Sequence, residues 1–169
     1  AGFYAKGAAD VNTMLTEQNA FLLDVREPAE IEKDGFIQGA VNIPIRDLLK
    51  NLDALPALDQ PIIIYCKSGH RGGLGMAALR LLGYTEVYNL GGGTGAWAKA
   101  ALPLETEGAP AAPVAGAAPE VDATRLANLD AFFRQYRGFC PGIPDCLIST
   151  MMVEAGHRRI PCAASGWVG

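Results

Sequence analysis

The chain has 169 residues, of which 50% are hydrophobic and 19% are charged. It can therefore bury a core, which excludes a wholly disordered protein. The formal net charge of −4 argues against a general electrostatic attraction to nucleic acid, although it is compatible with a local basic pocket. We predict no transmembrane segment, because no apolar run approaches the ~20 residues that a spanning helix needs. No targeting segment is predicted, and the sequence leaves the compartment unknown.

Residues 1–104 alternate short apolar runs with stretches of helical pattern. Strands are expected at 21–25, 40–43, 61–65 and 86–90, and helices at 27–33, 46–51, 72–82 and 94–101. The run 61–65 is apolar on both faces, which is typical of a central strand in a parallel sheet. The alternation as a whole predicts an α/β fold, with a sheet layered between helices.

Residues 105–121 form an Ala/Pro-rich linker in this division of the chain. Within 108–119, six residues are Ala, three are Pro and two are Gly, so the stretch is expected to be extended and solvated. A structured loop packed on the first domain is the alternative. A helix is expected at 122–137, where Leu126, Leu129, Phe133 and Tyr136 recur at helical spacing. Such a helix needs a surface to dock on, either the first domain or another chain.

The tail after this helix carries weak internal similarity. Residues 137–140 resemble residues 1–4, so residues 122–169 are open to interpretation as the start of a truncated second copy of the first domain. The tail also holds Cys140, Cys146, His157 and Cys162, separated by gaps of five, ten and four residues. These gaps do not form paired CxxC motifs, so we predict incidental thiols rather than zinc, and no metal or cofactor. Two alternatives for these cysteines are a disulfide between two of them, if the protein is exported, and a role for one of them in relaying sulfur from Cys66.

The strongest functional signal follows the predicted central strand directly. The loop that leads into the next helix reads Cys66, Lys67, Ser68, Gly69, His70 and Arg71. The carboxyl end of a central parallel strand is where α/β proteins place ligand sites. Backbone N–H groups, the helix dipole and the basic side chains should favour a thiolate over a thiol. The loop therefore predicts a sulfur nucleophile in an anion cradle, against the alternative that Cys66 is a small buried hydrophobe.

Four ordered motifs make residues 1–104 resemble a single rhodanese domain. The motifs are Leu-Asp-Val-Arg-Glu at 23–27, the run 35–44, the loop 66–71, and Leu-Gly-Gly-Gly at 90–93 followed by Trp97. The resemblance implies a central parallel sheet flanked by helices, with the loop cradling a cysteine persulfide. The linker and the C-terminal helix lie outside it.

The resemblance also implies roles for the loop. Cys66 would take a sulfane sulfur from a donor such as thiosulfate and pass it to cyanide, a thiol or a protein, with ping-pong kinetics. The loop from Lys67 to Arg71 would bind the substrate: its amides would stabilise the persulfide, and Lys67 and Arg71 would attract an anionic donor. His70 adds charge only when it is protonated. The alternative is a non-catalytic or carrier module that docks a partner or delivers persulfide sulfur.

Other motif residues are expected to be structural. Asp24 and Arg26 match the family's strand-end pair and should brace the floor of the loop by a charge-assisted hydrogen bond. Phe36 stands where this family often has a histidine. Residues 91–93 should form a tight turn near the loop, and Trp97 should anchor the core. Four residues separate Cys66 from Arg71, against five in related phosphatases and arsenate reductases, which favours a single sulfur atom over a tetrahedral oxyanion.

Overall fold

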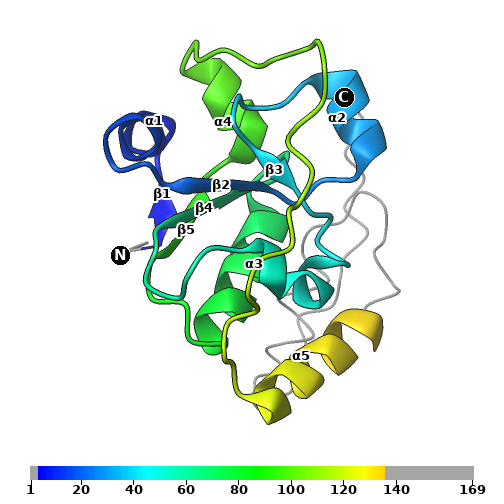
Figure 1. Ribbon diagram of the computed structural model, residues 1–169. Helices are drawn as coiled ribbons and strands as arrows, with labels where there is room; N and C mark the ends of the chain where they lie inside the picture. The colour runs from blue at the N-terminus through cyan, green and yellow to red at the C-terminus, as the bar shows by residue number, and fades with distance from the viewer. Residues whose placement is uncertain (1–3, 136–169) are drawn as a thin grey trace, which may run out of the picture. The chain divides into compact units, whose positions relative to one another are not determined.

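A five-stranded parallel sheet forms the centre of the computed structural model, which describes residues 4–135 (Figure 1). The strands lie in the order β1 (Ala5–Lys6), β5 (Val87–Leu90), β4 (Ile62–Tyr65), β2 (Phe21–Asp24) and β3 (Val41–Asn42). The predicted α/β class with a parallel sheet is confirmed. The compact unit that carries the sheet ends at Phe132. The predictions for Cys140, Cys146, His157, Cys162 and a truncated repeat fall on residues outside the described range.

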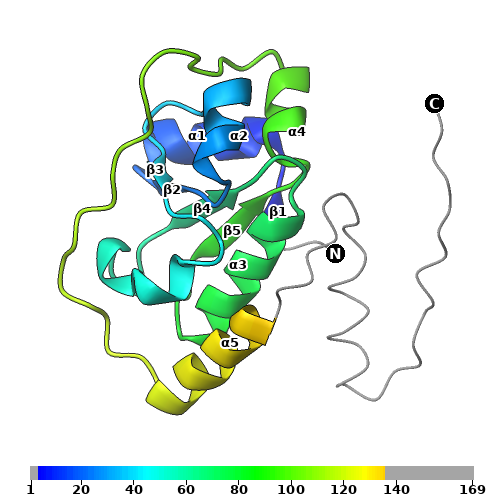
Figure 2. The same cartoon turned by 90° about the vertical axis from the view of Figure 1, so that its right-hand side faces the viewer.

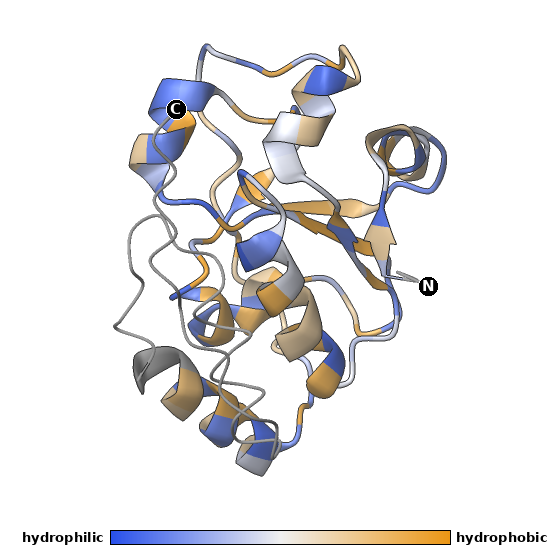
Figure 3. Cartoon of the chain, turned by 180° about the vertical axis from the view of Figure 1, so that it is seen from behind, coloured by the Kyte–Doolittle hydropathy of each residue, from blue (hydrophilic) through white to orange (hydrophobic). Residues whose placement is uncertain are grey.

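Strand β4 is central because both of its faces are apolar. It pairs with β2 on one side and β5 on the other, and each of its four residues is fully buried. The hydropathy colouring shows the strands as mainly apolar, while the helices carry polar and apolar segments side by side (Figure 3). Burial of such a strand on both faces places its carboxyl end, and the residue that follows it, inside the fold.

Helices cover both faces of the sheet (Figure 2). On one face lie α1 (Ala8–Glu17), α2 (Pro28–Asp34) and α4 (Gly93–Lys99). On the other face lie α3 (His70–Leu81) and two 3-10 turns, η1 (Leu48–Lys50) and η2 (Leu52–Ala54). Trp97 is 3% exposed and belongs to the core cluster that includes α1 and β4. It is therefore the core anchor that the sequence predicts.

The structure differs from the sequence prediction at four local elements. β1 and α1 were not predicted, and β1 has only two residues, too few to show a period. Where a helix was expected at 46–51, the chain forms the 3-10 turn η1, closed by bonds from the Lys50 N–H to the Asp47 carbonyl and from the Asn51 N–H to the Leu48 carbonyl, and η2 follows it. Such i to i+3 bonds suit a connector too short for a stable α-helix. α3 begins at His70 and not at residue 72, so its first turn belongs to the loop.

The Ala/Pro-rich stretch is extended, with mostly exposed side chains, but the domain holds its backbone at three points. Glu105 bridges to Phe36, Ala111 bridges to Val41 of the edge strand β3, and the Gly116 N–H donates to the Asp53 carbonyl. Helix α5 (Ala123–Gln135) follows and begins with a hydrogen bond from the Arg125 N–H to the Asp122 side chain. Among residues 4–135 no helix is both long and apolar enough to cross a membrane.

Candidate active site

Cys66 lies directly after β4, at the carboxyl end of the central strand. The residue is 1% exposed, which agrees with the alternative of a buried, small side chain. Its sulfur is nevertheless not in a purely apolar environment, because the Gly69 N–H donates a hydrogen bond of 3.1 Å to Sγ. A donor of this kind stabilises negative charge on sulfur, as required of a nucleophile.

Gly69 gives the loop its shape. Its φ of 93° lies in the left-handed region, and the residue caps the N-terminus of α3. A Cβ here would lie 3.0 Å from the Gly92 nitrogen, so the position requires glycine for both conformation and space. The first turn of α3 therefore begins beside the sulfur, where the positive end of the helix dipole favours an anion.

The first turn of α4 holds the other side of the loop. The Thr94 N–H donates to the Cys66 carbonyl and the Gly95 N–H donates to the Lys67 carbonyl, at 2.9 and 3.2 Å. Gly93 has a φ of 56°, and a Cβ on it would lie 2.1 Å from the Cys66 carbonyl oxygen. The glycine turn expected near the loop is thus in direct contact with its backbone.

Asn89 of β5 contacts the loop from within the sheet and was not predicted. Its Nδ2 donates to the Gly69 carbonyl at 2.9 Å, and the residue is 8% exposed. Asn89 stands in the otherwise apolar or aromatic strand Val-Tyr-Asn-Leu. A polar amide in a predicted strand that is otherwise apolar or aromatic is the signal that could have identified it.

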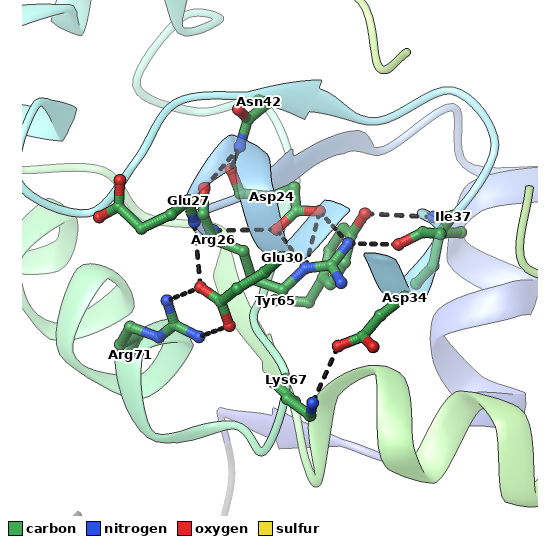
Figure 4. A network of polar contacts seen from close by, with 11 residues as sticks. Asp24, Arg26, Glu27, Glu30, Asp34, Ile37, Asn42, Tyr65, Lys67 and Arg71 are labelled. Carbon is green, nitrogen blue, oxygen red and sulfur yellow. Dashed lines mark hydrogen bonds and ion pairs between the residues drawn. The ribbon is translucent and has the colours of Figure 1, made fainter. Parts of the chain in front are cut away.

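Two carboxylates of α2 bind the basic side chains of the loop (Figure 4). Arg71 donates from both terminal nitrogens to Glu30, each at 2.6 Å, and Lys67 Nζ lies 2.8 Å from Asp34. The hydrogen bond from Arg71 holds the pKa of Glu30 below its usual value despite partial burial, and the bond from Lys67 similarly lowers the pKa of Asp34. The same bond to Glu30 raises the pKa of Arg71, with a smaller contribution from charge on Cys66.

The remaining two loop side chains are on the exposed side. Ser68 and His70 are both exposed, and Ser68 Oγ lies 2.9 Å from His70 Nδ1. The structure thus brings together Cys66 and Gly69 on the inner side of the loop, and it sets Ser68 and His70 outside.

Asp24 and Arg26 form a fully buried ion pair, with both side chains 0% exposed and Nη2 2.6 Å from Oδ2. Burial opposes the charge of Arg26, but the hydrogen bonds and charge of Asp24 outweigh it and raise the pKa of Arg26. Arg26 also donates to the Gly35 carbonyl at 2.8 Å, and its guanidinium carbon lies 5.5 Å from the centre of the Tyr65 ring. The pair therefore supports the loop through Tyr65, the residue before Cys66, and through the end of α2.

Tyr65 takes part in this support as a neutral phenol. Its hydroxyl oxygen accepts the Ile37 N–H at 3.2 Å. Burial, with the charge of Asp24, raises the pKa of Tyr65 well above its usual value. The floor of the site is therefore a fixed polar network, seen with its hydrogen bonds in Figure 4.

Comparison with known proteins links this site to one family. A profile of the Rhodanese-like domain matches residues 7–100. A sulfurtransferase of Allochromatium vinosum is 38% identical over 87 residues, which cover 52% of this chain and 79% of that protein. The thiosulfate sulfurtransferase PspE of Escherichia coli is 34% identical over 71 residues, covering 41% of this chain and 67% of that protein.

Other relatives match over different shares of their length. An uncharacterized Bacillus subtilis protein, YqhL, is 42% identical over 80 residues, and the match spans 62% of it and 47% of this chain. Among solved structures, a rhodanese-related protein of Thermoplasma volcanium superposes with a TM-score of 0.56 at 28% identity, covering 62% of this chain and all of that one. The human single-domain sulfurtransferase TSTD1 gives a TM-score of 0.53 at 28% identity, covering 58% of this chain and 97% of that one.

Proposed function

The chain belongs to the rhodanese-like domain family, and we propose that it is a sulfurtransferase that carries a sulfane sulfur as a persulfide on Cys66. The observation that supports this proposal most directly is the hydrogen bond from the Gly69 N–H to Sγ at the end of the central strand. Relatives that carry the name sulfurtransferase are 38% and 34% identical to parts of this chain, and the family profile matches residues 7–100, which contain this loop. We also propose the two substrates: thiosulfate as the sulfur donor, and cyanide or a thiol as the acceptor.

With thiosulfate as the donor, the first step is a nucleophilic displacement at sulfur. The Cys66 thiolate attacks the outer sulfur, a bond forms between Sγ and that sulfur, and the S–S bond of thiosulfate breaks. Sulfite leaves with the electron pair. In the second step an acceptor thiolate or cyanide attacks the outer sulfur of the persulfide, and Sγ leaves as the thiolate. The two halves give ping-pong kinetics and need no external oxidant or reductant.

The loop backbone stabilises charge in both steps. The Gly69 N–H bonded to Sγ and the N-terminus of α3 favour the thiolate before the first step and after the second. The side chains of Lys67 and Arg71 provide positive charge for an anionic donor. Their charges are already compensated by Asp34 and Glu30, so a thiosulfate dianion competes with those carboxylates. We therefore expect a high KM for thiosulfate.

The same ion pairs favour a second candidate, a carrier that receives sulfur from a persulfide on a protein or a small thiol. Such a donor is less negative than thiosulfate and gains less from unpaired cations, so compensation by Glu30 and Asp34 affects it less. This candidate uses the same persulfide on Cys66 and differs in the donor and in the turnover with cyanide.

Mass spectrometry of the full chain tests the proposal. After incubation with thiosulfate, the peptide that contains Cys66 should gain the mass of one sulfur atom, and added cyanide should remove it with release of thiocyanate. Cys66→Ser should show neither event while it unfolds at the wild-type urea concentration. A sulfur adduct that cyanide removes slowly favours the carrier. Thiocyanate formation at the wild-type rate by Cys66→Ser would refute both forms of the proposal.

A further inference from the structure

Asn89 is a buried amide fixed in the sheet next to the loop. Its backbone N–H donates to the Tyr4 carbonyl at 2.7 Å, and the residue pairs in register with Ala5 on one side and Ile64 on the other. From this fixed strand its Nδ2 reaches the Gly69 carbonyl. The side chain therefore connects the rigid centre of the fold to one residue of the loop.

Gly69 is bonded at both of its ends. Its carbonyl accepts from Asn89 Nδ2 and from the Gly73 N–H of the first helical turn, both at 2.9 Å, and its N–H donates to Cys66 Sγ. Glycine has more backbone freedom than any other residue. The direction of the Gly69 N–H therefore depends on what holds its carbonyl, and a first helical turn is readily lost.

The other end of the amide is left without a partner. Asn89 Oδ1 is buried and has no hydrogen bond within the described residues. Gly72 makes room for it, because a Cβ on Gly72 would lie 2.3 Å from that oxygen. Burial of an unpaired amide oxygen is unfavourable, and an apolar side chain in β5 would avoid it. The arrangement thus costs stability in order to deliver one N–H to Gly69.

We propose that Asn89 is a positioning residue for the sulfur chemistry: it holds Gly69 so that the Gly69 N–H points at Cys66 Sγ, and it thereby sets the reactivity of that sulfur. Asn89 does not touch Sγ in the hydrogen bonds of the structure and acts through Gly69 alone. The inference rests on the proposed function, because that function assigns the sulfur chemistry to Cys66. Its first test measures only the reactivity of the Cys66 sulfur and needs no sulfur donor.

The first test measures how the alkylation of Cys66 depends on pH. Wild type and Asn89→Leu, a substitution of similar size without a donor, are treated with iodoacetamide as full chains, and the Cys66 peptide is followed by mass spectrometry. In Asn89→Leu we expect the midpoint of the pH profile to move to higher pH. The alkylation rate at neutral pH, divided by the rate on the alkaline plateau, should be about threefold to tenfold lower than in wild type, which corresponds to one lost hydrogen bond. The midpoint is diagnostic because a merely looser loop changes access equally at every pH.

A second variant breaks the same contact from the opposite side. In Gly72→Ala the new methyl group would overlap Asn89 Oδ1, so the amide must turn away from Gly69 although Asn89 is still present. We expect the same displacement of the midpoint. The double variant should be displaced no further than either single variant, since both remove one and the same hydrogen bond.

Asn51→Leu is the matched control. Asn51 also donates from Nδ2 to a backbone carbonyl, that of Asp47, at 2.8 Å, but in the 3-10 region. The pH midpoint of alkylation in Asn51→Leu should equal that of the wild type. A wild-type midpoint in folded Asn89→Leu and Gly72→Ala would overturn the inference, as would an equal displacement in Asn51→Leu.

Urea unfolding establishes that each variant is folded. If Asn89→Leu does not fold, Asn89→Asp replaces it, because it keeps the shape and exchanges the N–H donor for a carboxylate oxygen. Its midpoint should also rise, and a wild-type midpoint would count against the inference. The proposed function fails separately, through the absence of a sulfur adduct on Cys66 of the wild-type chain.

Discussion

Arg71 of the loop and Glu30 of α2 lie 41 positions apart in the chain and form a two-fold hydrogen-bonded ion pair with both contacts at 2.6 Å. Their side chains are only 17% and 29% exposed, so solvent screens the pair incompletely. A bidentate pair of an arginine with a carboxylate is also among the stronger polar contacts. The cation that would bind an anionic donor is therefore already occupied by a carboxylate of the protein.

Glu30→Gln should lower the KM for thiosulfate. The variant removes the competing negative charge and frees Arg71 for the donor, and we expect a decrease of about threefold to tenfold, as for one partly buried charge contact. Glutamine also fits the capping box that Glu30 forms with Glu27 at the start of α2. Steady-state kinetics with thiosulfate and cyanide measure the effect. An unchanged or higher KM would show that Arg71 does not contact the donor.

Asp34→Asn removes the carboxylate that pairs with Lys67, as Glu30→Gln removes the one that pairs with Arg71, but at a more exposed ion pair. Lys67 is 59% exposed in its pair with Asp34, so water and salt screen the contact strongly. We expect the KM for thiosulfate to fall less than in Glu30→Gln, and the difference from wild type to disappear in high salt. Kinetics at low and high ionic strength test this order. An effect of Asp34→Asn larger than that of Glu30→Gln would place the donor at Lys67 instead.

The Glu30–Arg71 pair should make stability depend on pH in the acid range. Arg71 lowers the pKa of Glu30 in the folded state, so the pair stabilises the fold above the unfolded pKa of glutamate, and this contribution is lost as the pH falls through the folded pKa. Urea unfolding from about pH 6 to about pH 3, which spans the usual glutamate pKa of about 4.3, should show a steeper loss in wild type than in Glu30→Gln. Parallel curves for the two proteins would contradict this linkage.

The layers of the fold and the position of Cys66 at the end of the central strand could be predicted because their signals are local. The four apolar residues of β4 and the loop that starts at Cys66 are contiguous, so periodicity and residue type are sufficient. The glycines at 91–93 were also predicted to lie near the loop, and Gly93 contacts the Cys66 carbonyl oxygen there.

The hydrogen bonds and ion pairs that other elements make with the loop could not be predicted in this way. Glu30, Asp34 and Asn89 reach the loop across 41, 33 and 20 positions, and these distances in the chain are bridged only once the sheet order is fixed. The acidic residues of α2 have the pattern of an ordinary solvated helix face. Lys67 and Arg71 were therefore predicted as cations for a donor, and their partners on α2 were missed.

Arg26 and Asp24 provide a test of the floor of the site. Arg26→Met should destabilise the fold by about 3–5 kcal/mol, because it leaves the Asp24 carboxylate buried without its partner. The double variant Asp24→Asn, Arg26→Met should be more stable than Arg26→Met alone, since it removes both charges and both side chains are 0% exposed. Urea unfolding of wild type, the two single variants and the double variant gives the coupling between the residues. Additive losses in the double variant would mean that the two side chains stabilise the fold independently, and the support of Tyr65 and Cys66 would then have to come from elsewhere in the network.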